Sequence, residues 1–204
     1  QSGASDGDVL TFNSSTGILE LQTPAAGATN INGLSDGFAA GQSVGLGSFA
    51  LDEDDGTLNR NTAVGYQAGR YITGGTYNVA LGNGALLGDS TSKLLGLHNV
   101  GIGFNTGFDL TTGSYNTLIC TGAGANMTTG SYNVGLGWNA LSGDSAAGIT
   151  ASHNIGIGYQ TGSDLSTGTY NFLGGYQAGT NLTTGSNNVA IGNGALDAAT
   201  TSSD

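Results

Sequence analysis

The chain is poor in basic residues, proline and cysteine, and these shortages exclude several classes of protein. Only three of its 204 residues are Lys or Arg, and the net charge is -11. Such a surface has too few cations to displace phosphate counterions, so nucleic-acid binding is not expected. The 39 glycines show no Gly-X-Y period and accompany a single proline, which excludes collagen. Cys120 is alone and permits no intrachain disulfide.

Long apolar runs are also missing. No stretch approaches the ~20 apolar residues that cross a bilayer, so membrane insertion is not expected.

What the sequence does contain is an internal repeat led by asparagine, as in NVALGNGAL from Asn78 and NVAIGNGAL from Asn188. From Asn61 the leading residues are spaced 17, 21, 17, 17, 21, 17 and 17 apart, so three successive steps sum to 55. This predicts a duplicated unit of two short rungs and one long rung. The predicted rungs begin near residues 43, 61, 78, 99, 116, 133, 154, 171 and 188.

Each repeat indicates a short strand followed by a corner. Residues one and three after the leading Asn are mostly aliphatic, as in Ile155 and Ile157, and the residue between them is small. We interpret the aliphatic pair as facing the core, and small residues such as Ala80, Gly135 and Ala190 as permitting close approach of another chain.

The predicted fold is therefore all-β, a parallel β-solenoid of about nine rungs stacked ~4.8 Å apart over residues 42–204. One rung hides too few apolar groups to offset the entropy of ordering it, so the stack must fold cooperatively. The leading Asn residues are expected to form a hydrogen-bonded ladder.

Residues 1–41 form a separate predicted segment. Asp8–Phe12 and Ile18–Leu21 have the pattern of two strands joined by Asn13–Gly17 in a hairpin. This segment is expected to cap the first rung or to join the solenoid to another protein.

The strings SVGLG, NVALG and NVAIG resemble the head repeats of trimeric autotransporter adhesins, the YadA-like heads, and similar repeats occur in bacteriophage tail fibres. The resemblance covers about residues 43–196. It implies a β-roll in which three chains pack around an axis. The rungs of 17 and 21 residues are longer than those of the family.

Two inserted loops, residues 87–97 and 142–152, break the rung rule at matching places. Loops on a rigid scaffold often carry binding, so these loops are the first candidate site. Their shared residues are Gly88, Asp89 and Ser90 in the first loop and Gly143, Asp144 and Ser145 in the second.

Aromatic residues recur five positions after the leading Asn. Two interpretations stay open: packing within or between chains, or a stripe on which carbohydrate stacks. The residues are Tyr66, Phe104, Trp138, Tyr159 and Tyr176. His98 and His153 occupy a column otherwise held by tyrosines, which indicates an aromatic surface ladder rather than a metal site.

Other candidate sites are weaker. Asn13, Asn126 and Asn181 lie in glycosylation sequons. The acidic turn from Asp52 to Asp55 departs from the EF-hand pattern and is either solvated or a weak cation site. No catalytic set, metal site or cofactor is expected, because a regular wall offers no asymmetric pocket.

The sequence therefore predicts a non-enzymatic structural fibre, extracellular or on a virion surface, with an attachment role. The expected partners are two further copies in a homotrimer, end-to-end copies, and a cell-surface receptor or glycan. A self-polymerising extracellular filament without a receptor is the alternative. A solenoid that binds ice through threonine rows is a further one.

Overall fold

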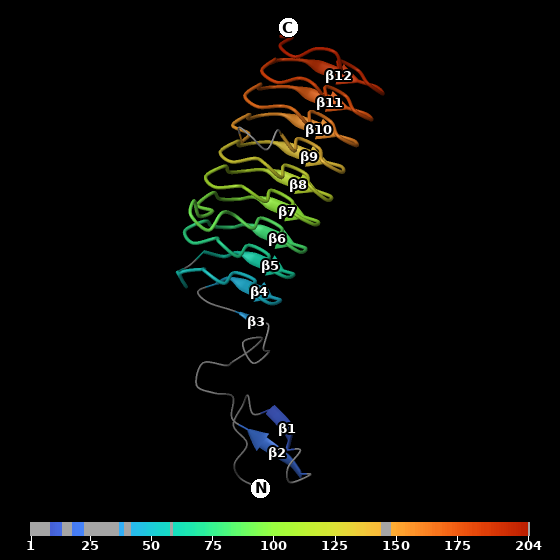
Figure 1. Ribbon diagram of the computed structural model, residues 1–204. Coiled ribbons are helices and arrows are strands. Elements are labelled where there is room, and N and C mark those ends of the chain that lie inside the picture. The colour runs from blue at the N-terminus through green and yellow to red at the C-terminus, as the bar shows by residue number, and fades with distance from the viewer. Residues whose placement is uncertain are drawn as a thin grey trace.

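The computed structural model is a β-solenoid whose coils stack along one axis (Figure 1). The structure describes Val9–Asn13, Ile18–Gln22, Gly37–Phe38 and residues 42–57, 59–143 and 148–203. Within these residues there is no helix, and nine parallel strands lie side by side in one sheet. They are β4 (Val44–Leu46), β5 (Thr62–Val64), β6 (Val79–Leu81), β7 (Val100–Ile102), β8 (Thr117–Ile119), β9 (Val134–Leu136), β10 (Ile155–Ile157), β11 (Phe172–Gly174) and β12 (Val189–Ile191). The predicted fold class is confirmed.

Three further strands belong to the N-terminal segment. β1 (Val9–Asn13) and β2 (Ile18–Gln22) pair antiparallel, with Val9 opposite Gln22. β3 (Gly37–Phe38) pairs antiparallel with β4 and so covers the first edge of the solenoid sheet. In the described part of the chain, β12 has a neighbour on one side only.

The two faces of the strands are the reverse of those predicted from sequence. The middle residue of each strand is buried, as in Ala80 and Gly135, whereas the aliphatic residues on either side point outward. Ile157, expected in the core, is 42% exposed. A three-residue strand cannot reveal its inward face by alternation alone, and the narrow coil has room only for small groups behind most strands.

Buried apolar residues from the returning part of each rung complete the core. Each short rung contributes one apolar residue after its turn glycine, which we call its peg, and these pegs are all fully buried or nearly so: Ile72, Leu110, Met127, Leu165 and Leu182. The long rungs supply Leu94 and Ile149 instead, which form parallel bridges to Ile72 and Met127. The inserted loops thus return to the same core column.

The predicted asparagine ladder is confirmed. Asn116 is fully buried, and its backbone N–H and its Nδ2 both donate to the Oδ1 of Asn99 at 3.0 Å. Its Nδ2 also donates to the Gly130 carbonyl at 2.8 Å, so the side chain ties the rung to the one before it and closes its own rung. The same pattern runs from Asn61 to Asn188, and it starts at Ser43, whose Oγ accepts from the Asn61 N–H.

Leucines and glycines interlock between rungs with a period of 55 residues. The space above and below Gly107 is filled by Leu86 of the preceding rung and Leu118 of the following rung, each within about 3.0 Å of where a Cβ would stand. Gly162 is enclosed in the same way by Leu141 and Leu173. This packing explains why three rungs, rather than one, form the repeating unit.

Among the described residues there is no helix that is long and apolar enough to cross a membrane.

Candidate functional site

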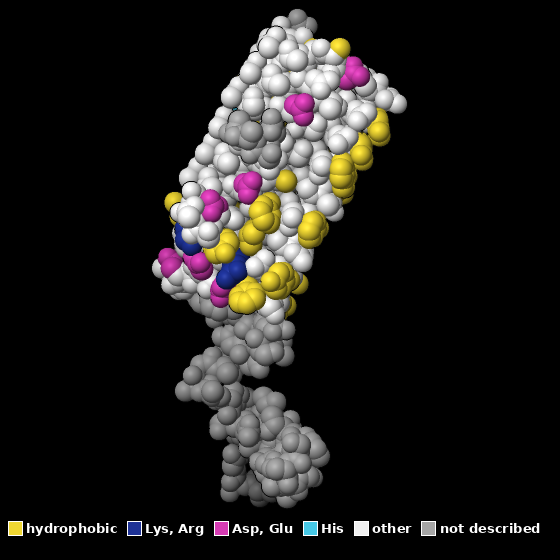
Figure 2. Space-filling view, viewed as in Figure 1, with side chains coloured by type: hydrophobic (Ala, Val, Ile, Leu, Met, Phe, Trp, Pro, Cys, Tyr) yellow, Lys and Arg dark blue, Asp and Glu magenta, His cyan; other side chains and the backbone are white. Residues whose placement is uncertain are grey.

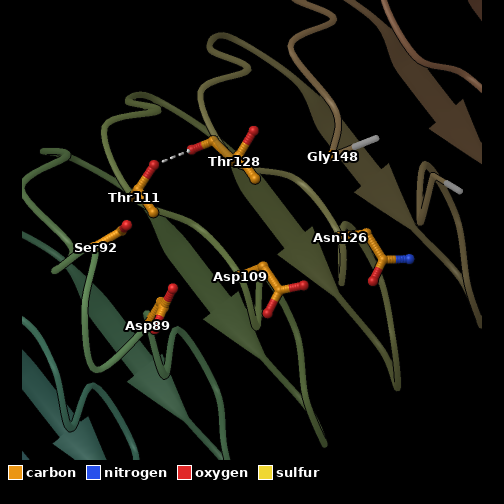
Figure 3. A pocket seen from close by; sticks show the side chains of 7 residues that line it. All are labelled: Asp89, Ser92, Asp109, Thr111, Asn126, Thr128 and Gly148. Atoms are coloured by element: carbon orange, nitrogen blue, oxygen red, sulfur yellow. Dashed lines mark hydrogen bonds between the residues drawn. The ribbon is translucent and has the colours of Figure 1, made fainter. Parts of the chain in front are cut away.

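A polar groove lies on the solenoid wall between the two inserted loops (Figure 3). Its volume is about 450 Å³. The first loop contributes Asp89 and Ser92, and Gly148 belongs to the second loop. The floor comes from the two short rungs between the loops, which contribute Asp109, Thr111, Asn126 and Thr128.

The regular rung positions the floor residues in two rows along the fibre axis. Leu110 and Met127 point into the core, so the residues before and after each of them point outward. Figure 3 shows Asp89, Asp109 and Asn126 in one row and Ser92, Thr111 and Thr128 in the other. A ligand that follows the axis therefore meets carboxylate or amide groups on one side and hydroxyls on the other.

Hydrogen bonds between rungs hold this floor. The Thr111 hydroxyl donates to the Thr128 carbonyl at 3.1 Å, and the Thr128 hydroxyl donates to the Ile149 carbonyl at 3.2 Å. Asn126 Nδ2 donates to the Gly143 carbonyl at 2.9 Å. Side chains fixed in this way present a preformed surface, which lowers the entropic cost of binding.

The first loop is held by a turn within it and by contacts of Lys93 with earlier rungs. Asp89 accepts hydrogen bonds from the backbone N–H of Thr91 at 2.9 Å and from its hydroxyl. Lys93 forms an ion pair with Glu53, and its ammonium lies 4.9 Å from the centre of the Tyr71 ring. Because Leu94 is buried beneath, the loop is a fixed ridge on the wall.

A second hollow of about 480 Å³ lies on the other flank of this ridge. It shares Ser92 and Thr111 with the first groove, and its remaining lining includes Lys93, the exposed Leu95 and several threonines. The two hollows together give a hydroxyl-rich surface around the first loop.

The groove is acidic and repels anions. Hydrogen bonds from Thr91 hold the pKa of Asp89 below its usual value. Burial, with a smaller contribution from the Asp89 carboxylate, raises the pKa of Asp109. No Lys or Arg is among the described residues that line this groove, so phosphate and carboxylate ligands are disfavoured. In the part of the chain that the structure describes, no three His, Cys, Asp or Glu residues gather to hold a metal ion.

The predicted loop residues are only partly brought together. Asp89 lines the groove, Gly88 is buried next to Tyr71 and Leu94, and Ser90 is exposed beside Asp89. Gly143 takes part through its carbonyl, and Asp144 and Ser145 lie outside the described residues. The four floor residues were missed as binding candidates because each belongs to a regular rung. Their outward positions on either side of a buried peg are the signal that would have identified them.

The aromatic stripe packs against itself along the fibre axis. Trp138, Tyr159 and Tyr176 are stacked with ring centres 4.9 and 5.0 Å apart and planes within 13°. Tyr66 meets Phe49 edge-on at 6.0 Å, and Phe104 is 51% exposed. Stacking covers the ring faces on which a sugar would lie, so within the stack of three the stripe presents mainly ring edges.

The second aromatic ladder is the one expected from the histidine positions. Six rings, Tyr77, His98, Tyr115, Tyr132, His153 and Tyr170, stack with centres 4.8 to 5.1 Å apart. Arg60 covers the first ring, with its guanidinium carbon 5.2 Å from the centre of Tyr77. Two tyrosines separate the histidines, so the pair does not share a ligand.

The sequons have different settings. Asn126 is in the groove and half-buried, and a glycan on its Nδ2 would replace the bond to Gly143 and fill the groove. Asn181 is exposed, and its Nδ2 donates to the Asp197 carbonyl. Asn13 lies at the end of β1, in a segment whose side chains are outside the described residues.

Comparison with known proteins gives no relative: no protein-family model, curated protein or solved structure matches this chain.

Proposed function

We propose that this chain is a structural surface fibre, extracellular or on a virion, which attaches to a glycan or receptor through the groove between its inserted loops. The preformed groove carries the proposal. It is a polar hollow on an otherwise regular wall, and its two walls come from the two places where the rung length changes. Such loops on a rigid scaffold are where binding sites are usually found.

We further propose that three copies assemble around an axis, as the resemblance to YadA-like heads implies. The support is the outward face of the sheet, where Val44, Val64, Ile157, Val189 and Ile191 are exposed beside the two aromatic ladders. Figure 2 shows hydrophobic side chains following one edge of the solenoid.

The apolar character of this face suits a homotypic interface. Nine strands at ~4.8 Å make it about 40 Å long, and three residues at ~3.3 Å make each strand about 10 Å wide, so the strands alone offer roughly 400 Å² and the flanking aromatic ladders add to it. An apolar patch of this size is seldom left in water. The small columns that the sequence had indicated for close approach are buried inside the chain, so the aliphatic columns take that role.

Exchange of both loops tests the attachment role. In the variant, residues 87–95 are replaced by residues 108–112 and residues 142–150 by residues 163–167, which restores the 17-residue spacing and keeps Leu86 and Leu141. On a glycan microarray we expect clearly weaker binding by the variant than by the wild-type chain, because the floor of the groove remains but its walls are lost, with matching circular dichroism and sedimentation. Undiminished binding by a folded variant would remove the groove from the proposal.

A self-polymerising filament is the second candidate. The observation that favours it is the free side of β12 in the described structure, where an added strand would continue the sheet and the asparagine ladder. We propose the N-terminal segment of another copy as the source of that strand. Deleting residues 1–40 should then shorten any filaments seen by electron microscopy, and long filaments from the truncated chain would contradict this joint.

A further inference from the structure

The floor of the groove has a structural duplicate three rungs further along. The first quartet is Asp109, Thr111, Asn126 and Thr128. The residues that follow these four by 55 positions are Asp164, Ser166, Asn181 and Thr183, which we call the second quartet. Both quartets occupy the two short rungs that follow a long rung.

Matching hydrogen bonds show that the two quartets share one geometry. The Ser166 hydroxyl donates to the Thr183 carbonyl at 3.1 Å, the same distance as from the Thr111 hydroxyl to the Thr128 carbonyl. Asn126 donates to the carbonyl of Gly143 in the next rung, and Asn181 also donates to a carbonyl of its next rung, that of Asp197, which stands one position before the equivalent of Gly143. The backbone N–H groups of Asp109 and Asp164 donate across the rungs at 2.9 and 3.0 Å.

The buried residues beneath the quartets are also equivalent. Leu110 and Met127 lie under the first, and Leu165 and Leu182 lie under the second. Each quartet therefore presents a carboxylate, an amide and two hydroxyls outward from a rigid floor, with no cation among them.

We propose that the second quartet is a second binding site for the same ligand as the groove, and that this ligand is a neutral, linear, hydroxyl-rich glycan. The inference rests on the proposed attachment function. Carboxylate and amide oxygens accept from sugar hydroxyls, and threonine and serine hydroxyls bond on the other side. Three rungs set the two sites about 14 Å apart along the axis.

The two sites differ in their walls. The first quartet has a loop on each side, with Asp89 and Ser92 before it and Gly148 after it, whereas the second quartet follows the second loop and no described loop comes after it. The second site is consequently shallower, and it binds a soluble oligosaccharide more weakly. On a surface dense in glycan, occupation of the first site raises the effective concentration at the second, so the pair binds more tightly than either alone.

Titration of wild-type chain with maltohexaose, cellohexaose and laminarihexaose, measured by isothermal calorimetry, tests the inference. We expect at least one of these neutral hexasaccharides to bind two sites per chain. Asp109→Ala and Asp164→Ala should each weaken one site at least ten-fold and leave the other, and the double variant should lose both. Alanine is tolerated at this position, because Ala198 holds it in the last rung. Thr167→Ala, an exposed change outside both quartets, is the control and should bind as wild type.

The outcomes separate the two proposals. If Asp109→Ala abolishes all binding and Asp164→Ala changes nothing, the second site is refuted and the attachment groove stands. If no neutral hexasaccharide binds although loop-dependent binding is seen on the microarray, the ligand class is wrong. If the wild-type chain binds a hexasaccharide and both single variants bind it equally well, both the groove and its duplicate are refuted.

Discussion

Gly137 and Gly192 hold the same position in their rungs but face different surroundings. Both have left-handed backbone angles, with φ of 137° and 130°. A Cβ on Gly137 would overlap the carbonyl oxygen of Gly158 in the next rung, whereas one on Gly192 would meet only Ala195 at 4.0 Å. We expect Gly137→Ala to lower the melting temperature clearly more than Gly192→Ala, because both carry backbone strain and only the first adds a clash between rungs. Equal decreases in the melting temperature would show that backbone strain alone, without the clash between rungs, accounts for the loss of stability.

The asparagine ladder makes a second prediction at the residue scale. Asn116→Ala would leave the Asn133 N–H and the Gly130 carbonyl without their buried partners, at a cost of about 2–4 kcal/mol. Asn116→Ser should lose less, because Ser43 shows that a hydroxyl can accept from the next rung, at 3.1 Å from the Asn61 N–H. Chemical denaturation of the two variants measures the difference, and a serine variant as unstable as the alanine variant would contradict the ladder as the cause.

At the scale of the element, the rungs are not interchangeable although their backbones repeat. Deleting residues 116–170 removes 55 residues and brings Leu173 against Gly107, reproducing its contact with Gly162. Deleting residues 116–132 removes 17 residues and takes away Leu118, which fills the space at Gly107 and Gly135. We expect the smaller deletion to give the lower melting temperature, since its cavity costs about 2–5 kcal/mol. If melting follows only the number of rungs, the three-rung interlock is not a packing unit.

At the scale of the whole molecule, the observed strand faces predict that a charge has different effects on the outward face and on the buried face of the sheet. Ile157 is outward and Leu173 is fully buried, and they occupy neighbouring strands, β10 and β11. Leu173→Asp would bury an unpaired carboxylate and should unfold the stack. Ile157→Asp should keep the circular dichroism spectrum but shift the mass in light scattering from trimer to monomer. A trimer that survives Ile157→Asp would place the interface on another face.

The sequence by itself determined the stack. The 55-residue period requires stacked equivalent rungs, and the leading asparagines recur at one position of each rung, so their pattern along the chain predicted the solenoid and its ladder. The position of His98 and His153 among tyrosines likewise predicted the surface ladder.

Only the tertiary structure decided which way the strands face and what gathers on the wall. A strand of three residues shows only one change between its two faces, and both Val79 and Ala80 are apolar enough to be buried. Which of the two faces points into the core therefore depends on the space left by leucines such as Leu118 in neighbouring rungs. The groove was hidden for a related reason. Asp89 stands out in the sequence because it interrupts the repeat, whereas Asp109, Thr111, Asn126 and Thr128 form a site only when successive rungs align them beside the loops.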